Sequence, residues 1–399
     1  MRRGTETAEN LERLMPDMTA WRRHLHMHPE LSFREERTSA WIAEHLAAFG
    51  CDEVRTGVAG TGVVAVIRGE RPGPVVALRA DIDALPIQDE KDAPYRSTVP
   101  GVMHACGHDA HTAALLGVAA HYAAARDSLA GERRLIFQPA EEVTPGGAIG
   151  VIEAGVLDGV SAIYGVHLWT PLPSGTVASA PGPVMATEDE FDLEIRGKGG
   201  HGGMPHETVD AIAAGAAFVQ GVQTIVSRSV DPLEPAVVSI GSFHAGTAAN
   251  IIAEVCRLSG TVRTFDATVR ERVRERLQAS AEAVCRQFGA EFSLDWRHGY
   301  PPVVNDEREA ERFFAVARGL FGDAAVRRIR PLMTSEDFAY YLQRVPGCFM
   351  FVGAGNAECG AVWPHHHPRF DIDERAMLQA ARLLVAMADH YAEEASSAA

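Results

Sequence analysis

The sequence lacks the cysteine patterns that indicate disulfide cross-linking or a zinc finger. Its six cysteines are scattered over 399 residues, and no two of them form a CxxC pair. Such spacing is typical of a protein kept in a reducing compartment, where most thiols are inert. Stability must then come from packed cores, and a chain of 399 residues is long enough for two of them.

Long apolar runs and an excess of positive charge are missing as well. The most apolar segments, residues 113–125 and 211–226, are interrupted by polar residues or glycine and fall short of the roughly 20 residues that cross a bilayer. Lys and Arg number 37 against 53 for Asp and Glu, and this net charge of −16 disfavours a nucleic-acid partner. No apolar segment follows Arg2 and Arg3, so we expect a cytoplasmic protein without a membrane segment.

Apolar strands alternate with helices over the first half of the chain, which predicts an α/β domain with a mainly parallel sheet. We expect strands at 63–67, 75–78, 135–137 and 162–166, and helices at 35–49, 109–127 and 147–154. A strand and helix pattern resumes after residue 305 and ends in a long amphipathic helix over 373–394.

A second unit interrupts this pattern after the proline- and glycine-rich segment 181–187. Its predicted elements follow the order of a ferredoxin-like βαββαβ module. They are strand 190–196, helix 207–227, strands 236–243 and 255–264, helix 267–288 and strand 291–297. We therefore expect a first domain formed by residues 1–186 and 298–399, with an inserted domain at 187–297.

Charged or metal-binding residue types follow three of the predicted parallel strands. Asp81 and Asp83 follow the second strand, Glu141 and Glu142 follow the third, and His167 follows the fourth. In open α/β sheets, sites lie beyond the carboxyl ends of the strands, so these side chains should converge. Taken singly, each has another explanation: a turn for the aspartates, a solvated loop edge for the glutamates, a core histidine for His167.

The densest chemical signal is the segment 103–111, Met-His-Ala-Cys-Gly-His-Asp-Ala-His, at a probable helix start. Cys106 and His108 are separated by one glycine and can point at one metal such as Zn²⁺, which takes thiolate, imidazole and carboxylate ligands. The alternative is one histidine that caps the helix while the others are exposed. Adjacent carboxylates such as Glu141 and Glu142 diverge, so one can bind metal while the other accepts a proton.

Two further segments carry histidines with a possible role. The glycine-rich run 197–206 permits close approach of the backbone to a ligand, and His201 within it is placed to stabilise an oxyanion. A flexible hairpin with an incidental histidine explains the run equally well. Three consecutive histidines, His365 to His367, suggest metal binding by composition, and a mobile loop is the alternative.

The joint order of the motifs resembles the amidohydrolase family of hippurate hydrolases, N-acyl-amino-acid deacylases and indole-acetyl-amino-acid hydrolases, within the aminoacylase and carboxypeptidase clan. The resemblance covers nearly the whole chain. It is carried by the segments His26–Phe33, Leu78–Pro86, Met103–His111, Gln138–Glu142, Gly199–His206, Gly260–Phe265, Met333–Phe338 and His366–Asp371.

The resemblance implies a set of metal ligands, namely Cys106, His108, Glu142, His167 and His366. Cys106 would bridge two divalent ions per subunit, which could be Zn, Mn, Co or Ni, and Glu141 would be the general base. Related clan members have a histidine ligand where this chain has Asp81, so Asp81 is not expected to bind metal. Asp83 would orient a ligand. His365 stands where an apolar residue is usual, which leaves the choice among His365, His366 and His367 open.

For the inserted domain the resemblance implies substrate contacts and a role as a lid and in dimerisation. His201 would be the oxyanion donor, from the same subunit or from a partner, and Asn250 and Arg263 would lie near the substrate carboxylate. Two positions depart from the family pattern, because Ala253 replaces a proline and Gly202-Gly203 replaces two alanines.

The expected activity is metal-dependent hydrolysis of the amide bond of an N-acyl amino acid, hippurate or a related compound, to a carboxylic acid and a free amino acid. A dipeptidase or carboxypeptidase with the same dinuclear site is the enzymatic alternative. A metal- or thiol-based sensor built on Cys106 is the third hypothesis, but a sensor has no need for Glu141 beside Glu142.

Overall fold

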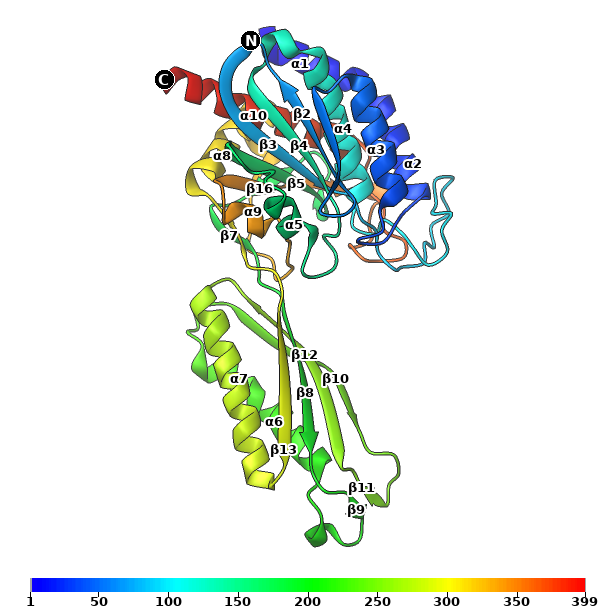
Figure 1. Ribbon diagram of the computed structural model, residues 1–399, viewed down its shortest axis with the longest axis vertical. Coiled ribbons are helices and arrows are strands. Elements are labelled where there is room, and N and C mark those ends of the chain that lie inside the picture. Colours follow the sequence, from blue (N-terminus) through cyan, green and yellow to red (C-terminus); the bar gives the residue numbers. More distant parts are fainter. Residues whose placement is uncertain (1, 399) are drawn as a thin grey trace. The chain divides into compact units, whose positions relative to one another are not determined.

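The structure is a computed structural model that describes residues 2–398. The chain divides into two compact units, drawn in Figure 1. The first comprises residues 1–184, 304–330 and 337–399, and the second comprises residues 185–303 and 331–336. The fold class predicted from the sequence, an α/β domain that carries an inserted ferredoxin-like module, is confirmed.

The first unit contains an eight-stranded sheet with the order β1-β2-β4-β3-β5-β16-β6-β15. The four central strands, β4, β3, β5 and β16, run parallel, while β1, β2 and β6 each pair antiparallel with a neighbour. The strands are β1 (Glu53–Val58), β2 (Gly62–Arg68), β3 (Arg71–Asp81), β4 (Ala130–Gln138), β5 (Val160–Pro173), β6 (Val177–Ser179), β15 (Val326–Arg328) and β16 (Gly347–Gly355).

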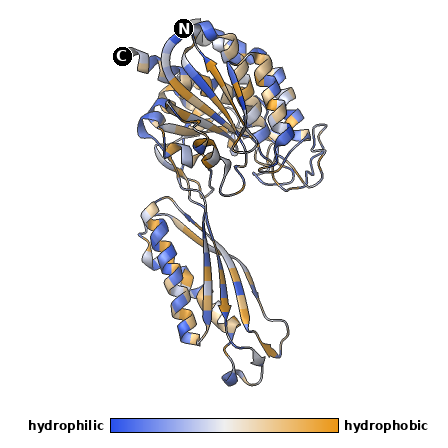
Figure 2. Ribbon diagram, viewed as in Figure 1, coloured by the Kyte–Doolittle hydropathy of each residue, from blue (hydrophilic) through white to orange (hydrophobic). Residues whose placement is uncertain are grey.

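Helices pack against this sheet around one apolar core. The helix α4 is buried along nearly its whole length, because its alanine-rich sequence lets it pack between α2, α3, α10 and the sheet. Figure 2 shows the apolar character of the central strands. The helices are α1 (Arg2–Arg13), α2 (Met15–Met27), α3 (Glu36–Phe49), α4 (His108–Ala124), α5 (Gly147–Glu153), α8 (Glu307–Phe321), α9 (Ala339–Leu342) and α10 (Arg375–Ala398).

The second unit is an antiparallel sheet with the order β10-β12-β8-β13 and two helices. Asp210 and Asp266 cap the two helices, each accepting hydrogen bonds from two backbone N–H groups of the first turn. The elements are β8 (Asp189–Arg196), α6 (Ala211–Thr224), β10 (Ala236–Ala245), β12 (Val255–Thr264), α7 (Ala267–Phe288) and β13 (Glu291–His298). Two short strands, β9 (Gly200–His201) and β11 (Ile251–Ile252), form a separate ladder, and β7 (Gly182–Met185) pairs with β14 (Val303–Asn305).

Two helix predictions need correction. The helix expected over 207–227 is α6 and begins at Ala211, because Pro205–Glu207 forms a 3₁₀ turn and Val209 pairs with Lys198 in an isolated bridge. The N-terminal helices α1 and α2 were not expected from the sequence.

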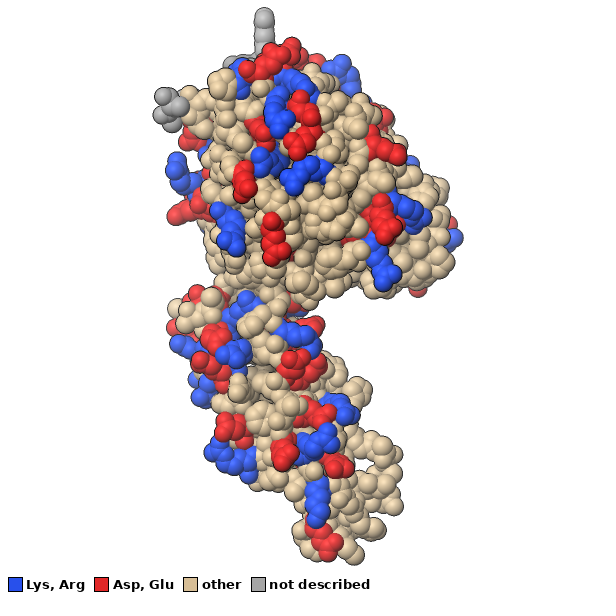
Figure 3. Space-filling model, in the orientation of Figure 1, with Lys and Arg blue, Asp and Glu red and all other residues tan. Residues whose placement is uncertain are grey.

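None of the helices in the described part of the chain has the length and apolar character to span a bilayer. On the face drawn in Figure 3, acidic and basic side chains are interspersed over both units.

Candidate active site and metal centre

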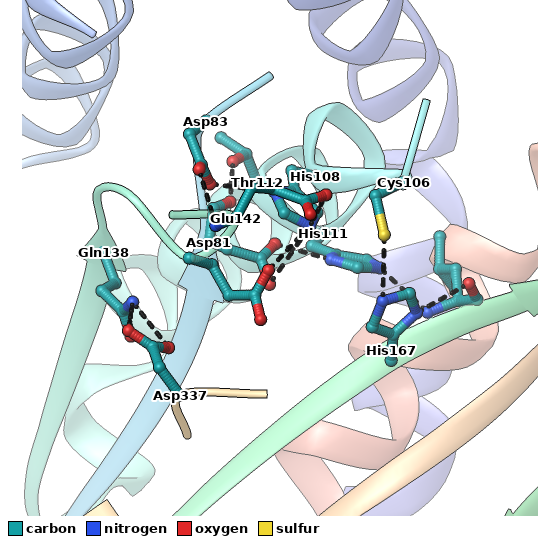
Figure 4. Close-up of polar contacts among 12 residues, drawn as sticks. Asp81, Asp83, Cys106, His108, His111, Thr112, Gln138, Glu142, His167 and Asp337 are labelled. Carbon is teal, nitrogen blue, oxygen red and sulfur yellow. Dashed lines mark hydrogen bonds and ion pairs between the residues drawn. The ribbon is translucent and has the colours of Figure 1, made fainter. Parts of the chain in front are cut away.

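The ends of two parallel strands, the middle of a third and the start of one helix meet in the first unit. Asp83 follows β3, Glu142 follows β4 and His167 lies on β5, while Cys106 and His108 come from the start of α4 (Figure 4). The Cys106 Sγ lies 3.5 Å from the His167 Nε2, and the His108 Nε2 lies 3.7 Å from the Glu142 Oε1. Cys106, His108, Glu142 and His167 therefore surround a common centre, and Asp83 lies behind His108, bonded to its Nδ1.

Potential ligand atoms form two groups that share one thiol. Among five such groups in the described residues, the two that share the thiol are Cys106, His108 and His167, and Cys106, Glu142 and His366. Within each group the ligand atoms lie within 4.8 Å of one another.

Hydrogen bonds set the tautomers of His108 and His167, which are both buried. The His167 Nδ1 lies 3.0 Å from the carbonyl oxygen of Leu168, and the His108 Nδ1 lies 3.1 Å from the Asp83 Oδ1. Both contacts require an Nδ1–H donor, so each ring keeps the lone pair of its Nε2 for the centre. Outer hydrogen bonds of this kind orient histidine ligands in metalloproteins.

Asp83 connects two of the strands that supply the site. Its Oδ1 accepts from His108, and its Oδ2 accepts from the Glu142 backbone N–H at 3.0 Å and the Ser32 hydroxyl at 2.7 Å. One buried carboxylate therefore orients a histidine and fixes the backbone of the glutamate opposite it.

Asp81 and His111 form a second support that the sequence analysis did not assign. The His111 Nδ1 donates to the Asp81 Oδ1 at 2.7 Å, and its Nε2 accepts the backbone N–H of Leu168 at 2.9 Å. Both ring nitrogens are used, so His111 has no lone pair for a metal. It instead holds the β5 backbone next to His167, and only the proximity of His111 to the Cys106 cluster hinted at a role.

The site is strongly negative. Burial alone would lower the pKa of His108, but the carboxylates of Asp81 and Asp83 raise it to about 10. Burial, together with the carboxylates of Glu142 and Glu141, holds the pKa of the Cys106 thiol well above its usual range. A cation at this place would reverse both effects, because a coordinating thiol is deprotonated and a coordinating imidazole is neutral.

The turn that carries the two glutamates has an unusual backbone. Ala140 has a φ of 52°, in the left-handed region that costs a residue with a side chain about 1–3 kcal/mol. Its carbonyl oxygen accepts the Gly147 N–H at 3.0 Å. The next residue, Glu141, is buried, and its Oε2 lies 4.0 Å from the His108 Nε2.

The histidine triplet brings two side chains to the site. The His366 Nε2 lies 3.4 Å from the Glu142 Oε2, whereas the half-buried His365 places its Nδ1 3.8 Å from the Cys106 Sγ. The His365 Nε2 accepts the Thr170 N–H, and its ring stacks on Trp169. His367 instead stacks on Trp363. This geometry favours His366 as the ligand that shares Glu142.

The remaining candidate residues belong to the second unit. His201 and Asn250 are exposed neighbours, because Ile251 pairs with His201 and the Gly202 N–H donates to the Asn250 carbonyl oxygen. Arg263 lies near the other end of β12, where it contacts Glu188 and Ser335. The eight steps from Val255 to Arg263 alone span about 26 Å at the usual rise of a strand.

The sequence matches the description Peptidase family M20/M25/M40 over residues 77–390. The chain belongs to this family. It is 48% identical to an N-acyl-L-amino acid amidohydrolase of Geobacillus stearothermophilus, with 81% of this chain and 86% of the relative covered. It is 40% identical to thermostable carboxypeptidase 2 of Saccharolobus solfataricus, with 92% and 95% covered.

A solved structure of a Bacillus subtilis protein, described as a dinuclear metal-binding peptidase of the M20 family, aligns with a TM-score of 0.82 at 38% identity. The alignment covers 96% of this chain and 99% of that one. As a member of family M20, the protein is a hydrolase of the amidohydrolase and peptidase type.

The residues at the centre fit the divalent metal ions of family M20. The His108 Nε2 and the Glu142 Oε1 are buried and face each other, and neither has a hydrogen-bond partner among the described residues. Leaving such atoms unpaired is costly unless a cation satisfies them. Imidazole, thiolate and carboxylate donors together suit a borderline metal such as Zn²⁺.

Proposed function

We propose that this protein hydrolyses the amide bond of N-acyl amino acids with two divalent metal ions per subunit. The observation that carries the proposal is the pair of ligand groups that share Cys106, with Glu141 beside them. Cys106, His108 and His167 would hold one ion, and Cys106, Glu142 and His366 the other. When bound, the ions polarise the scissile carbonyl and lower the pKa of the attacking water.

Glu141 is the residue proposed to move the proton. It follows Ala140, whose backbone N–H and carbonyl oxygen are both hydrogen-bonded, and it lies beside His108. Its carboxylate therefore stays at the edge of the ligand cluster. We assign it the removal of a proton from the attacking water and the return of that proton to the leaving amine nitrogen. Asp83 contributes by orienting His108 and the Glu142 backbone.

The substrate would be recognised by groups of the second unit. Arg263 presents a planar guanidinium, which matches a carboxylate with two parallel hydrogen bonds, and the free carboxylate of an N-acyl amino acid offers that shape. His201 would donate to the oxyanion, a contribution typically worth about 3–4 kcal/mol, and Asn250 beside it would contact the substrate. We also propose that this unit acts as a lid and in dimerisation.

A carboxypeptidase or dipeptidase is the second candidate, because the similarity to the Saccharolobus carboxypeptidase is extensive. The same site would act on a peptide bond, so the two activities differ only in the acyl half of the substrate. The test is a panel of hippurate, other N-acyl amino acids and dipeptides, assayed after chelation and reloading with Zn²⁺, Mn²⁺, Co²⁺ or Ni²⁺. We expect kcat/KM to be highest for an N-acyl amino acid. A preference for dipeptides would favour the second candidate, and no metal-dependent hydrolysis would exclude both.

A further inference from the structure

A buried carboxylate outside the ligand cluster holds the turn that precedes the proposed base. Glu35 has no exposed surface, and it comes from the loop before α3. Its Oε1 accepts the backbone N–H of Ala140 at 2.9 Å and that of Phe33 at 3.0 Å, while its Oε2 accepts the Thr61 hydroxyl. Glu35 therefore ties together three segments that are distant in the sequence.

The contact with Ala140 occurs at the one residue of this turn whose backbone is left-handed. The Ala140 N–H is held by Glu35 and its carbonyl oxygen by the Gly147 N–H, so both polar groups of its backbone are fixed. Without the first contact, Ala140 would relax toward the right-handed or extended region that a residue with a side chain prefers. That rotation would change the direction of Glu141, the next residue.

Glu142 has a separate support. Its own N–H donates to Asp83, which does not contact Glu35 by any hydrogen bond among the described residues. The two neighbouring glutamates therefore depend on different carboxylates, Glu141 through Glu35 and the ligand Glu142 through Asp83.

We propose that Glu35 is a positioning residue for the general base, acting through its hydrogen bond to the left-handed Ala140. This inference rests on the proposed function of Glu141. The positioning role depends on how far the Glu35 oxygens extend from the backbone and not on their charge. The reason is that their partners are backbone N–H groups and a hydroxyl. A glutamine keeps an oxygen at the same distance from the backbone, whereas an aspartate keeps the charge but withdraws both oxygens by one methylene.

The experiment compares Glu35→Gln, Glu35→Asp and Glu35→Ala in the metal-loaded full chain. We expect Glu35→Gln to retain kcat within about threefold, and Glu35→Asp and Glu35→Ala to lose about 100-fold in kcat with little change in KM, as misplacement of a reacting group implies. Bound metal per subunit should stay at the wild-type level in all three, because the support of Glu142 is intact. A protein that is merely destabilised would lose metal and active fraction together.

Glu30→Ala is the matched control. Glu30 lies in the same loop, and its carboxylate accepts the Thr38 N–H and the Arg37 guanidinium, but none of its hydrogen bonds to described residues reaches the 138–142 turn. We expect this variant to lower stability and to keep kcat within about threefold. An equal fall of kcat in Glu30→Ala, or an order in which Glu35→Asp outperforms Glu35→Gln, would overturn the proposal.

Hydrogen exchange of the Ala140 amide supplies a measurement that does not depend on catalysis. It should be protected in the wild type and in Glu35→Gln and exchange faster in Glu35→Asp. Unchanged protection of this amide in Glu35→Asp would overturn the positioning role, whether or not the proposed substrate is correct. Conversely, the wild-type protein could fail to hydrolyse amides while the variants still show the expected exchange pattern. That result would contradict the proposed function and leave Glu35 as the residue that holds the turn.

Discussion

The hydrogen-bond partners of each buried histidine near the centre determine which of its ring nitrogens carries the proton. His108 gives its Nδ1–H to a carboxylate and His167 gives its Nδ1–H to a carbonyl, so both keep a lone pair at Nε2. His111 uses both nitrogens and keeps none. Whether a histidine here is available to a metal or serves as a support therefore depends on its hydrogen bonds, and not on its position in the motif.

The assignment of Glu141 as base predicts a specific loss. Glu141→Gln keeps the size of the side chain but removes the proton acceptor, so turnover should fall by about 10²–10⁴-fold or more. Fold and metal content should not change, because Glu141 is not one of the proposed ligands. Steady-state kinetics with metal analysis of the same preparation checks this. Activity within about tenfold of the wild type would contradict the assignment.

Cys106 should show its role in alkylation experiments. As a bridging thiolate it should be shielded while metal is bound and become reactive after chelation, when the thiol is freed. Cys359 is exposed and serves as the internal control, since its labelling should not depend on metal. Mass spectrometry of the labelled peptides gives both rates. Equal labelling of Cys106 with and without chelator would argue that it is not a ligand.

The sequence shows some of these residues more readily than others. Cys106 and His108 lie two residues apart, so their density can be recognised without a structure. The support from Glu35 to Ala140 spans 105 residues, and that from His111 to Leu168 spans 57. Neither carries a local pattern, because each depends on how the strands are ordered in the sheet.

At the scale of elements, the helix α2 joins the two segments that carry proposed ligands. The fully buried Arg22 contacts Asp109, next to His108, at 2.8 Å. It also contacts Asp371 at 2.7 Å and Glu374 at 3.3 Å, on the segment that follows the histidine triplet. The helix α2 could not be predicted from the spacing of apolar residues, because two of its four buried residues are the polar Arg22 and His26.

This arrangement predicts that Arg22→Met is strongly destabilising. It leaves the buried carboxylate of Asp109 and the half-buried carboxylates of Asp371 and Glu374 without this cation, and removing one partner of a buried ion pair typically costs about 3–5 kcal/mol. Arg22→Lys should recover only part of this, because one ammonium cannot replace a planar guanidinium that serves three carboxylates. Urea unfolding of the metal-free protein, followed by a probe in the first unit, measures the loss.

Arg297→Met is a matched control for Arg22→Met. Arg297 also contacts three carboxylates, those of Glu190, Asp192 and Asp295, but its side chain is 47% exposed. Exposed ion pairs contribute about 1 kcal/mol or less. If the two methionine variants lost equal stability, burial would not be what makes the Arg22 cluster important.

At the scale of the whole molecule, the chain order of β8, α6, β10, β12, α7 and β13 made the inserted module predictable, since each element has its own cap or periodicity. The positions of its functional residues are a different matter. His201 and Asn250 lie beyond the Val255 end of β12, whereas Arg263 lies near the other end. They are separated by more than about 26 Å along the sheet. The scissile carbonyl and the free carboxylate of an N-acyl amino acid are only a few bonds apart and cannot span this distance.

If His201 and Arg263 both contact substrate, they must therefore come from different copies of the chain, and a mixing experiment tests this. Glu141→Gln and His201→Ala homodimers should each be inactive. After subunit exchange, one site of every heterodimer has both intact groups, so about a quarter of the wild-type activity should return. Mixing Glu141→Gln with His108→Ala should restore nothing, because those two residues serve one site of one chain. A folded, exchanging mixture without recovery would mean that His201 serves its own subunit or does not act in catalysis.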